Sequence, residues 1–301
     1  MTGIMWWSVL GLAMATLSPS ALRWMARRGA DAGVLLLAWA VSVCLTVFAV
    51  ALPGLAELIH RCWLALHAGP PGGLDTSVGV ISGGLVAFAA VKGGWRLATI
   101  GRCRQSLHAR HAELAWVLHS RAPRADGVLW LPTSEWHAYS LAGDPPLVVL
   151  STGVRECLDE AAIRAVVAHE RAHLQRRHHL LIAVAYAVAA GLWWLPLARQ
   201  SPSLVRTLVE LDADAHAARV YGHRPLRRAL LLLRDASSPA AALGIAGDCV
   251  RLRLARLSGP PSPCTARFAA SAAHSTAVLL AVTSLLAMGV LTTALASCTA
   301  G

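Results

Sequence analysis

Charged residues are scarce in this chain. Only 14% of its 301 residues are Asp, Glu, Lys or Arg, whereas about one quarter of an average soluble protein is charged. Hydrophobic residues make up 56% of the chain. This composition excludes a disordered protein and an ordinary soluble enzyme, and it indicates a helical membrane protein.

Lysine is almost absent. Lys92 is the only lysine, so arginine supplies nearly all the positive charge behind the formal net charge of +11. Many of the arginines flank apolar runs. This pattern is typical of a membrane protein with positively charged cytoplasmic faces, and we expect no direct binding of nucleic acid.

The seven cysteines form no C-x-x-C pair. Metal sites and disulfide frameworks built from cysteine have recognisable spacings, and none is present. The sequence therefore predicts neither a disulfide-stabilised fold nor a cysteine zinc site.

Long apolar runs are the main feature that is present. Arginine-rich segments follow the first and the third run, which places both segments in the cytoplasm and the N-terminus outside. The first run lacks the basic start and the cleavage site of a secretory signal, so we expect a retained helix. The five runs are 4–17, 34–55, 78–97, 180–197 and 273–297.

These runs predict three domains: helices crossing the membrane in 1–98, a cytoplasmic domain in 99–265, and a C-terminal membrane helix in 266–301. The expected class is a mainly α membrane protein with about four transmembrane helices and a cytoplasmic α+β domain.

Within the cytoplasmic domain, the segments 128–131, 137–141 and 147–150 are short, rich in Val, Leu and aromatic residues, and separated by turn residues. They predict a small sheet. An edge strand of that sheet could hold a substrate as an added strand, or it could serve only as core.

The spacing H-E-x-x-H occurs at His169, Glu170 and His173, after a plausible helix cap at Asp159. Two imidazoles at i and i+4 point from one face of a helix and can share a zinc ion. The glutamate between them can accept a proton from a water molecule that the metal activates. The pattern therefore predicts a catalytic zinc site on a helix.

A catalytic zinc ion usually has three protein ligands. Glu210 is the expected third ligand, and Asp214, at i+4 on the same face, can accept the free N–H of a ligand histidine. His179 is rejected as a ligand, because a helix that continues past His173 turns His179 away from it.

The apolar run 180–197 lies between the two parts of this site. Residues 174–209 are 36 in number, too few for two crossings of about 20 residues each. The run is therefore expected to be membrane-embedded or re-entrant, or a buried core helix, which leaves four true crossings and the C-terminus outside.

The remaining polar groups are expected at the surface. The run 176–179 is interpreted as a basic cytoplasmic edge, and the arginines of 251–256 as charges on a helix surface. His216 and His223 are candidates for contacting a substrate near the metal.

Several features in this order resemble the BlaR/MecR-type family of integral-membrane zinc metallopeptidases. The HtpX/Ste24-type membrane peptidases are similar in the zinc motifs alone. The resemblance covers about residues 1–225 and rests on the three N-terminal runs, 147–154, the H-E-x-x-H helix, 193–197 and 210–214.

The resemblance implies a gluzincin-like peptidase domain with one zinc ion. His169, His173 and Glu210 would be its ligands, Glu170 the general base and Asp214 a support for a ligand. It further implies a site facing the cytoplasm of a bacterial cell, in a multi-pass protein of the cytoplasmic membrane.

The implied role is signal transduction, in which the enzyme cleaves a protein such as a DNA-binding transcriptional repressor. The expected partners are that substrate, the lipid bilayer and a second copy in a homodimer. The alternatives are an HtpX-like protease for membrane-protein quality control and a non-catalytic membrane scaffold.

Overall fold

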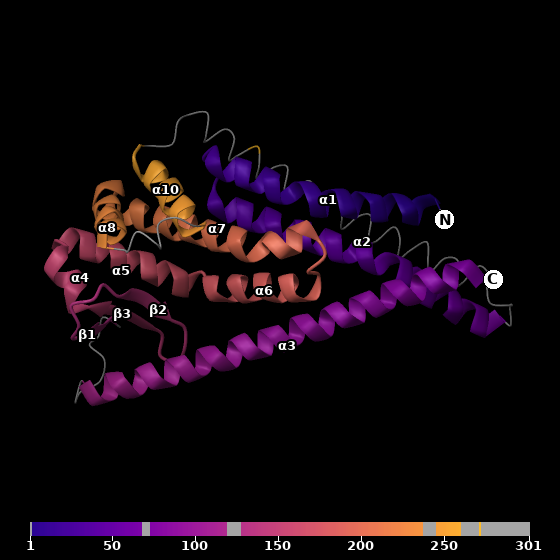
Figure 1. Ribbon diagram of the computed structural model, residues 1–301, viewed down its shortest axis with the longest axis horizontal. Helices are drawn as coiled ribbons and strands as arrows, with labels where there is room; N and C mark the ends of the chain where they lie inside the picture. The colour runs from indigo at the N-terminus through magenta and orange to yellow at the C-terminus, as the bar shows by residue number, and fades with distance from the viewer. Residues whose placement is uncertain (1, 68–72, 119–127, 237–244, 260–270, 272–301) are drawn as a thin grey trace.

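The computed structural model describes residues 2–67, 73–118, 128–236, 245–259 and 271 (Figure 1). Three long helices come first: α1 (Thr2–Arg27), α2 (Ala32–His67) and α3 (Gly73–Leu118). α1 packs on α2, and α3 contacts α2 and then α6. A small sheet and the later helices gather at the opposite end of the molecule (Figure 1).

One stretch within the described residues, Ala32–Ala51 in α2, is long and apolar enough to cross a membrane. The predicted crossings 4–17 and 78–97 lie in α1 and α3. The predicted crossing 273–297 falls outside the described residues. The arrangement with four crossings therefore stays a prediction.

A tight turn joins α1 to α2. Gly29 has a φ of 93°, in the left-handed region that glycine adopts without steric cost. Asp31 then caps α2 by accepting a hydrogen bond from the backbone N–H of Val34 at 3.1 Å. This turn faces the site described below.

The predicted sheet is confirmed. It comprises β1 (Val128–Leu131), β2 (Ala138–Leu141) and β3 (Leu147–Ser151) in the order β1-β3-β2. β3 is parallel to β1 and antiparallel to β2. All five residues of β3 are buried, as expected of a central strand. β2 is left at an edge of the sheet.

Two capped helices follow the sheet. Ser151 caps α4 (Thr152–Cys157), and Asp159 caps α5 (Glu160–Gln175) by accepting from the backbone N–H of Ala162 at 2.8 Å. The helix predicted around the H-E-x-x-H motif thus begins where its cap predicts.

The expectation that this helix continues through His179 is wrong. It ends at Gln175, and Arg177 adopts a left-handed conformation with a φ of 51°. A new helix, α6 (His178–Gly191), then begins. The break changes the direction of the backbone. His178 and the residues after it therefore do not lie where one continuous helix would place them.

The apolar run 180–197 forms no single long helix. α6 ends at Gly191 and α7 (Pro196–Tyr221) begins with proline in its first turn, where the missing N–H costs nothing. α6 packs between α3 and α7. α6 and α7 run side by side (Figure 1). The tight return brings Glu210 back to α5, as the predicted site requires.

Two further helices close the domain: α8 (His223–Ala236) and α10 (Ile245–Leu257). α8 contacts α5, and α10 contacts both α7 and α8. The largest core cluster joins α1, α2, α6 and α7, where the buried Trp39 donates a hydrogen bond from its indole N–H to Ser201 at 2.8 Å. α6 and α7 therefore share a core with the first two helices.

Candidate metal centre

Helix α5 carries the H-E-x-x-H residues on the wall of a pocket. Its buried side includes Ala162, Ala165 and Ala172, small residues that allow close packing against α7. His169 is buried and His173 is half-buried on the neighbouring turn. The spacing of i and i+4 places both rings on the same side of the helix.

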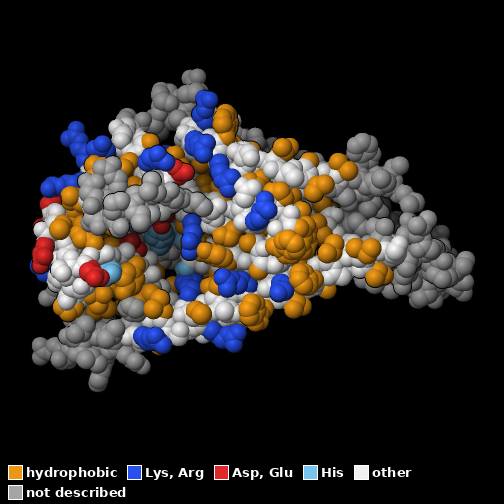
Figure 2. All heavy atoms as spheres, in the orientation of Figure 1, with side chains coloured by type: hydrophobic (Ala, Val, Ile, Leu, Met, Phe, Trp, Pro, Cys, Tyr) orange, Lys and Arg blue, Asp and Glu red, His pale blue; other side chains and the backbone are white. Residues whose placement is uncertain are grey.

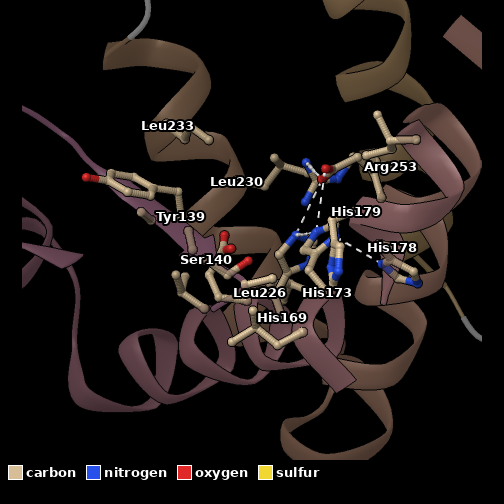
Figure 3. Close-up of a pocket in the computed structure, with 18 of the residues that line it drawn as sticks. Tyr139, Ser140, His169, His173, His178, His179, Leu226, Leu230, Leu233 and Arg253 are labelled. Carbon is tan, nitrogen blue, oxygen red and sulfur yellow. Dashed lines mark hydrogen bonds and ion pairs between the residues drawn. The ribbon is translucent and has the colours of Figure 1, made fainter. Parts of the chain in front are cut away.

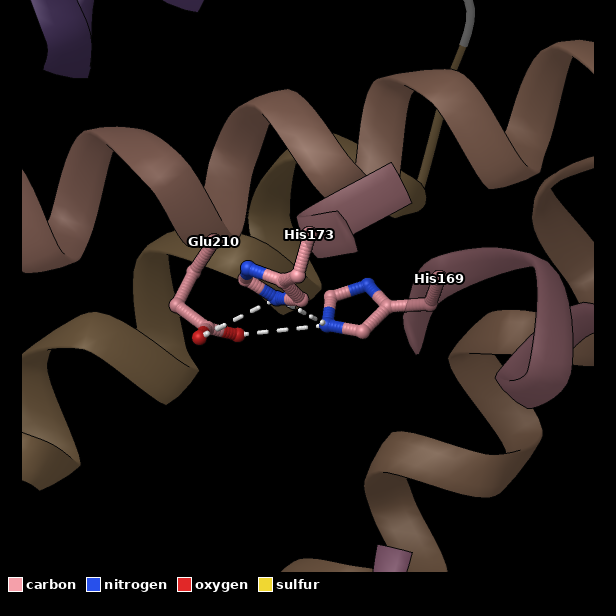
Figure 4. A group of neighbouring side chains, drawn as sticks. All are labelled: His169, His173 and Glu210. Atoms are coloured by element: carbon pink, nitrogen blue, oxygen red, sulfur yellow. Dashed lines mark hydrogen bonds and ion pairs between the residues drawn. The ribbon is translucent and has the colours of Figure 1, made fainter. Parts of the chain in front are cut away.

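The structure brings His169, His173 and Glu210 together (Figure 4). One donor atom from each lies within 4.8 Å of the others. The two Nε2 atoms are 3.2 Å apart, and they lie 3.4 Å and 3.6 Å from the carboxylate oxygens of Glu210. This is the group predicted as the metal ligands.

Two imidazoles and one carboxylate are a donor set that suits zinc. The charge of the pocket suits a cation as well. Burial opposes a positive charge on His169, but the carboxylates of Asp214 and Glu210 outweigh it and raise the pKa of His169 to about 10. A field that favours a proton on His169 also favours a divalent cation, so the residues fit a zinc ion.

Asp214 backs His169 from the far side of the ring. Its Oδ1 atom lies 3.0 Å from Nδ1 of His169, while Nε2 of His169 faces Glu210. A carboxylate in this position fixes the tautomer and the orientation of a ligand histidine. Asp214 therefore lies against the ring nitrogen of His169 that faces away from Glu210.

Arg253 is a site residue that the sequence analysis missed. Its guanidinium lies 2.7 and 2.8 Å from the two oxygens of Asp214 and 2.8 Å from Oε2 of Glu210. Its side chain is only 12% exposed. The expectation that 251–256 carries surface charge is wrong here, because α10 packs against α7 and turns this arginine inward.

Arg253 keeps both carboxylates ionised. Burial opposes ionisation of Glu210, but a hydrogen bond with His169 and the charge of Arg253 outweigh it and lower the pKa of Glu210. The pKa of Asp214 is lowered in the same way, against burial, by its close contact with His169 and its hydrogen bonds with Arg253. Both groups are thus held in the form that a metal site needs.

His178 backs the other ligand, His173. The two Nδ1 atoms are 3.0 Å apart, and Nε2 of His178 lies 2.9 Å from Oδ2 of Asp212. Arg176 also pairs with Asp212. The interpretation of 176–179 as a basic cytoplasmic edge is therefore wrong for His178, which is 1% exposed. Arg176 stays 41% exposed although it pairs with Asp212.

Glu170 points into the pocket beside the two histidines. Burial raises its pKa, and the neighbouring His169 and a hydrogen bond with Ser140 of β2 partly oppose this. A general base works best when its pKa lies near the working pH. A raised pKa therefore suits Glu170 for accepting and returning a proton.

The pocket itself has a volume of about 450 Å³. β2, α5, α8 and Arg253 of α10 contribute to its walls (Figure 3), and histidine side chains are visible inside a hollow in the space-filling view (Figure 2). The described residues that line the pocket include His179 but neither His216 nor His223. His223 is exposed at the start of α8.

Residues 103–200 match the model of peptidase family M48. The matched segment contains the sheet and the H-E-x-x-H helix and ends before Glu210, so the third ligand rests on the geometry alone.

The chain is also similar to the plastoglobule-localized metallopeptidase 48, chloroplastic, of Arabidopsis thaliana, with 31% identity over 104 residues. The matched part covers 35% of this chain and 29% of that relative. No solved structure matches the chain. The comparisons thus support a metallopeptidase domain and do not single out the BlaR/MecR type.

Proposed function

We propose that the chain is a membrane-embedded zinc endopeptidase. His169, His173 and Glu210 hold one zinc ion, and Glu170 is the general base. The observation that carries this proposal is the meeting of the three donor side chains in a pocket beside Glu170, within a chain whose residues 103–200 match a peptidase family.

When bound, zinc supplies a Lewis acid that polarises the scissile carbonyl and makes water acidic near neutral pH. Glu170 accepts a proton from the attacking water on its carboxylate and then donates that proton to the leaving amine. The burial that raises the pKa of Glu170 makes the first transfer, acceptance of the proton from water, easier. Arg253 and Asp214 hold Glu210 and His169 in place throughout.

The substrate is proposed to be an extended protein segment that lies along β2. Ala138, Tyr139 and Ser140 of this edge strand line the pocket, and β3 pairs with β2 on one side only. Among the described residues no strand covers its other edge. An added strand would bind there through main-chain hydrogen bonds.

The proposed role is signalling at the bacterial cytoplasmic membrane, with a site that faces the cytoplasm and cleaves one protein such as a transcriptional repressor. The support is the order of apolar runs and motifs and the position of the arginines. Figure 2 shows Lys and Arg side chains across the middle of one face, next to a region rich in hydrophobic side chains.

The test compares new protein N-termini in host cells that express the wild-type chain, Glu170→Gln or Glu160→Gln. Glu160 lies at the exposed start of the same helix and pairs with Arg164, so it controls for the loss of a carboxylate. A single cut in a small DNA-binding protein, absent only with Glu170→Gln, is expected.

A second candidate is quality control of membrane proteins, as in HtpX-like peptidases. The open edge of β2 favours it, because main-chain pairing tolerates many sequences. Scattered cuts that depend on Glu170 would support this candidate. No cut that depends on Glu170, also under cell-wall stress, would favour the non-catalytic scaffold.

A further inference from the structure

We propose that His178 and Asp212 are positioning residues for the metal-ligating His173. His178 would fix the orientation of the His173 ring, and Asp212 would fix His178. The inference rests on the proposed zinc site and extends it to two residues that do not reach the metal.

The first support is the direction of the hydrogen bonds. Nε2 of His173 faces Glu210, so this nitrogen is the one left for a metal, and the proton of the neutral ring belongs on Nδ1. The nearest partner of that N–H is Nδ1 of His178, 3.0 Å away. His178 must then accept at Nδ1.

An imidazole that accepts at Nδ1 carries its own proton at Nε2. In His178 this atom lies 2.9 Å from Oδ2 of Asp212, and a carboxylate accepts such a proton well. The donors and acceptors therefore alternate without conflict from His173 through His178 to Asp212. A chain of this kind holds each ring in a single tautomer.

The second support is burial. His178 is 1% exposed and the Asp212 side chain 6% exposed. Water therefore cannot replace either partner, and removing one leaves the other with an unmade hydrogen bond. A histidine that needs no hydrogen-bond partner could stand on an exposed face of α5 or α6. His178 is buried instead.

The third support is the backbone that places His178. In one continuous helix, a residue five positions after His173 would point well away from it. The left-handed Arg177 ends α5 and turns His178 back towards the metal ligands. A left-handed conformation is uncommon for a residue other than glycine, and here it is needed to make the contact.

The first turn of α2 packs beside Asp212, the last residue in this series of hydrogen bonds. A Cβ atom on Gly33 would lie 3.3 Å from Nη2 of Arg176 and 3.5 Å from Oδ1 of Asp212. The first of these distances is tight, so the absence of a side chain at Gly33 lets α2 approach Arg176 closely. Asp212 is thus buried beside α2, while Arg176 covers it from the solvent side.

The experiment uses the full chain in detergent micelles and Zn²⁺ alone as the probe, with its affinity measured by competition against a chromophoric chelator. His178→Leu removes both hydrogen bonds. His178→Gln keeps an acceptor and a donor on one planar group. His223→Leu, a change to an exposed histidine of α8 that does not line the pocket, is the matched control.

We expect His178→Leu to weaken zinc binding by about 10- to 100-fold, the usual effect of removing an outer support of a ligand. His178→Gln should recover most of that loss, and His223→Leu should bind as the wild type does. Asp212→Asn should weaken binding in the wild-type background and have little further effect in His178→Leu, because its influence passes through His178.

The absorption spectrum of the Co²⁺-substituted protein gives a second measurement, since it depends on the arrangement of the ligands. His178→Leu should change this spectrum, and His178→Gln should restore it. A residue that only fills the core would leave the spectrum unchanged. Should His178→Leu fail to fold, Asp212→Asn and His178→Gln decide the question.

Unchanged zinc affinity in a folded His178→Leu or in Asp212→Asn would overturn the inference, as would additive effects of the two substitutions. His173→Ala separates this failure from failure of the zinc site. If His173→Ala also binds zinc as tightly as the wild type, the proposed function is wrong as well.

Discussion

The two histidines of the candidate metal site lie one helical turn apart in surroundings of opposite kind. His169 has a carboxylate directly behind it, and that carboxylate is held by Arg253. His173 has a second imidazole behind it, and a carboxylate only beyond that ring. We call these the Asp214 side and the Asp212 side of the site.

The difference shows in the proton affinities of the two rings. Burial is the largest influence on both and disfavours their charged forms. Carboxylates overcome burial at His169 and raise its pKa to about 10. At His173 burial prevails, aided by the charge of His169, and lowers the pKa to about 4. A ligand site can thus be supported by charge on one side and by an uncharged hydrogen bond on the other.

The substitution with the largest expected effect leaves both sides of the site intact. Glu170→Gln should lower the rate of peptide hydrolysis by roughly 10²- to 10⁴-fold, because it removes the general base, while zinc stays bound. The rate is measured with purified chain and a quenched peptide library, with Glu160→Gln as the control. Equal rates in all three proteins would remove Glu170 from the mechanism.

Arg253→Met acts mainly on the Asp214 side. It leaves the buried Asp214 and the partly exposed Glu210 without their shared cation, and removal of one partner from a buried ion pair costs about 3–5 kcal/mol. We expect a loss of this size in the free energy of unfolding of the metal-free protein. Arg251→Met, which changes an exposed arginine of the same helix, should have little effect. Similar losses for Arg253→Met and Arg251→Met would mean that the ion pairs of Arg253 with Asp214 and Glu210 are not formed in solution.

Asp214→Asn weakens the charged support of His169 but keeps the shape of the side chain. Zinc affinity should fall by about 10- to 100-fold. The fall should exceed that of Asp212→Asn, since the latter acts through an intervening ring. Zinc affinities from chelator competition give both values. The reverse order would show that the Asp212 side dominates.

The pH dependence of the metal-free protein should separate the two rings. The raised pKa of His169 stabilises the fold fully below about pH 6.5, and this contribution is lost as the pH rises towards about 10. The lowered pKa of His173 acts in the opposite direction, so stability is lost as the pH falls from 6.5 towards about 4.

The measurement is the free energy of unfolding against pH in the presence of a chelator. His169→Gln should flatten the alkaline limb of the curve, and His173→Gln should flatten the acid limb. Glu210 and Asp214, with lowered pKa values, add to the loss on the acid side and remain in both variants. A change in the same limb for both variants would contradict the comparison.

Local patterns predicted much of this architecture. The short runs rich in Val, Leu and aromatic residues, bounded by turn residues, located β1, β2 and β3 to within one residue, since these residue types favour strands. The cap at Asp159 and the i, i+4 spacings located the metal group, because those spacings define one face of a helix. Each of these signals lies within a single element.

The residues that were missed depend on contacts between elements. Arg253 reaches Asp214 across 39 positions of sequence, and no local pattern in α10 distinguishes it from Arg251. One signal was available: three carboxylates expected at one site require a nearby cation. His178 was misjudged because the break at Arg177 has no glycine or proline to announce it.

The most direct test of the account is the zinc content of the purified chain together with its hydrolysis of a peptide library. The account predicts one zinc ion per chain in the wild type and in Glu170→Gln, with hydrolysis in the wild type alone. It predicts much less zinc in His173→Ala and Glu210→Ala. Equal zinc content in all four proteins, or hydrolysis that persists in His173→Ala after its zinc is lost, would contradict it.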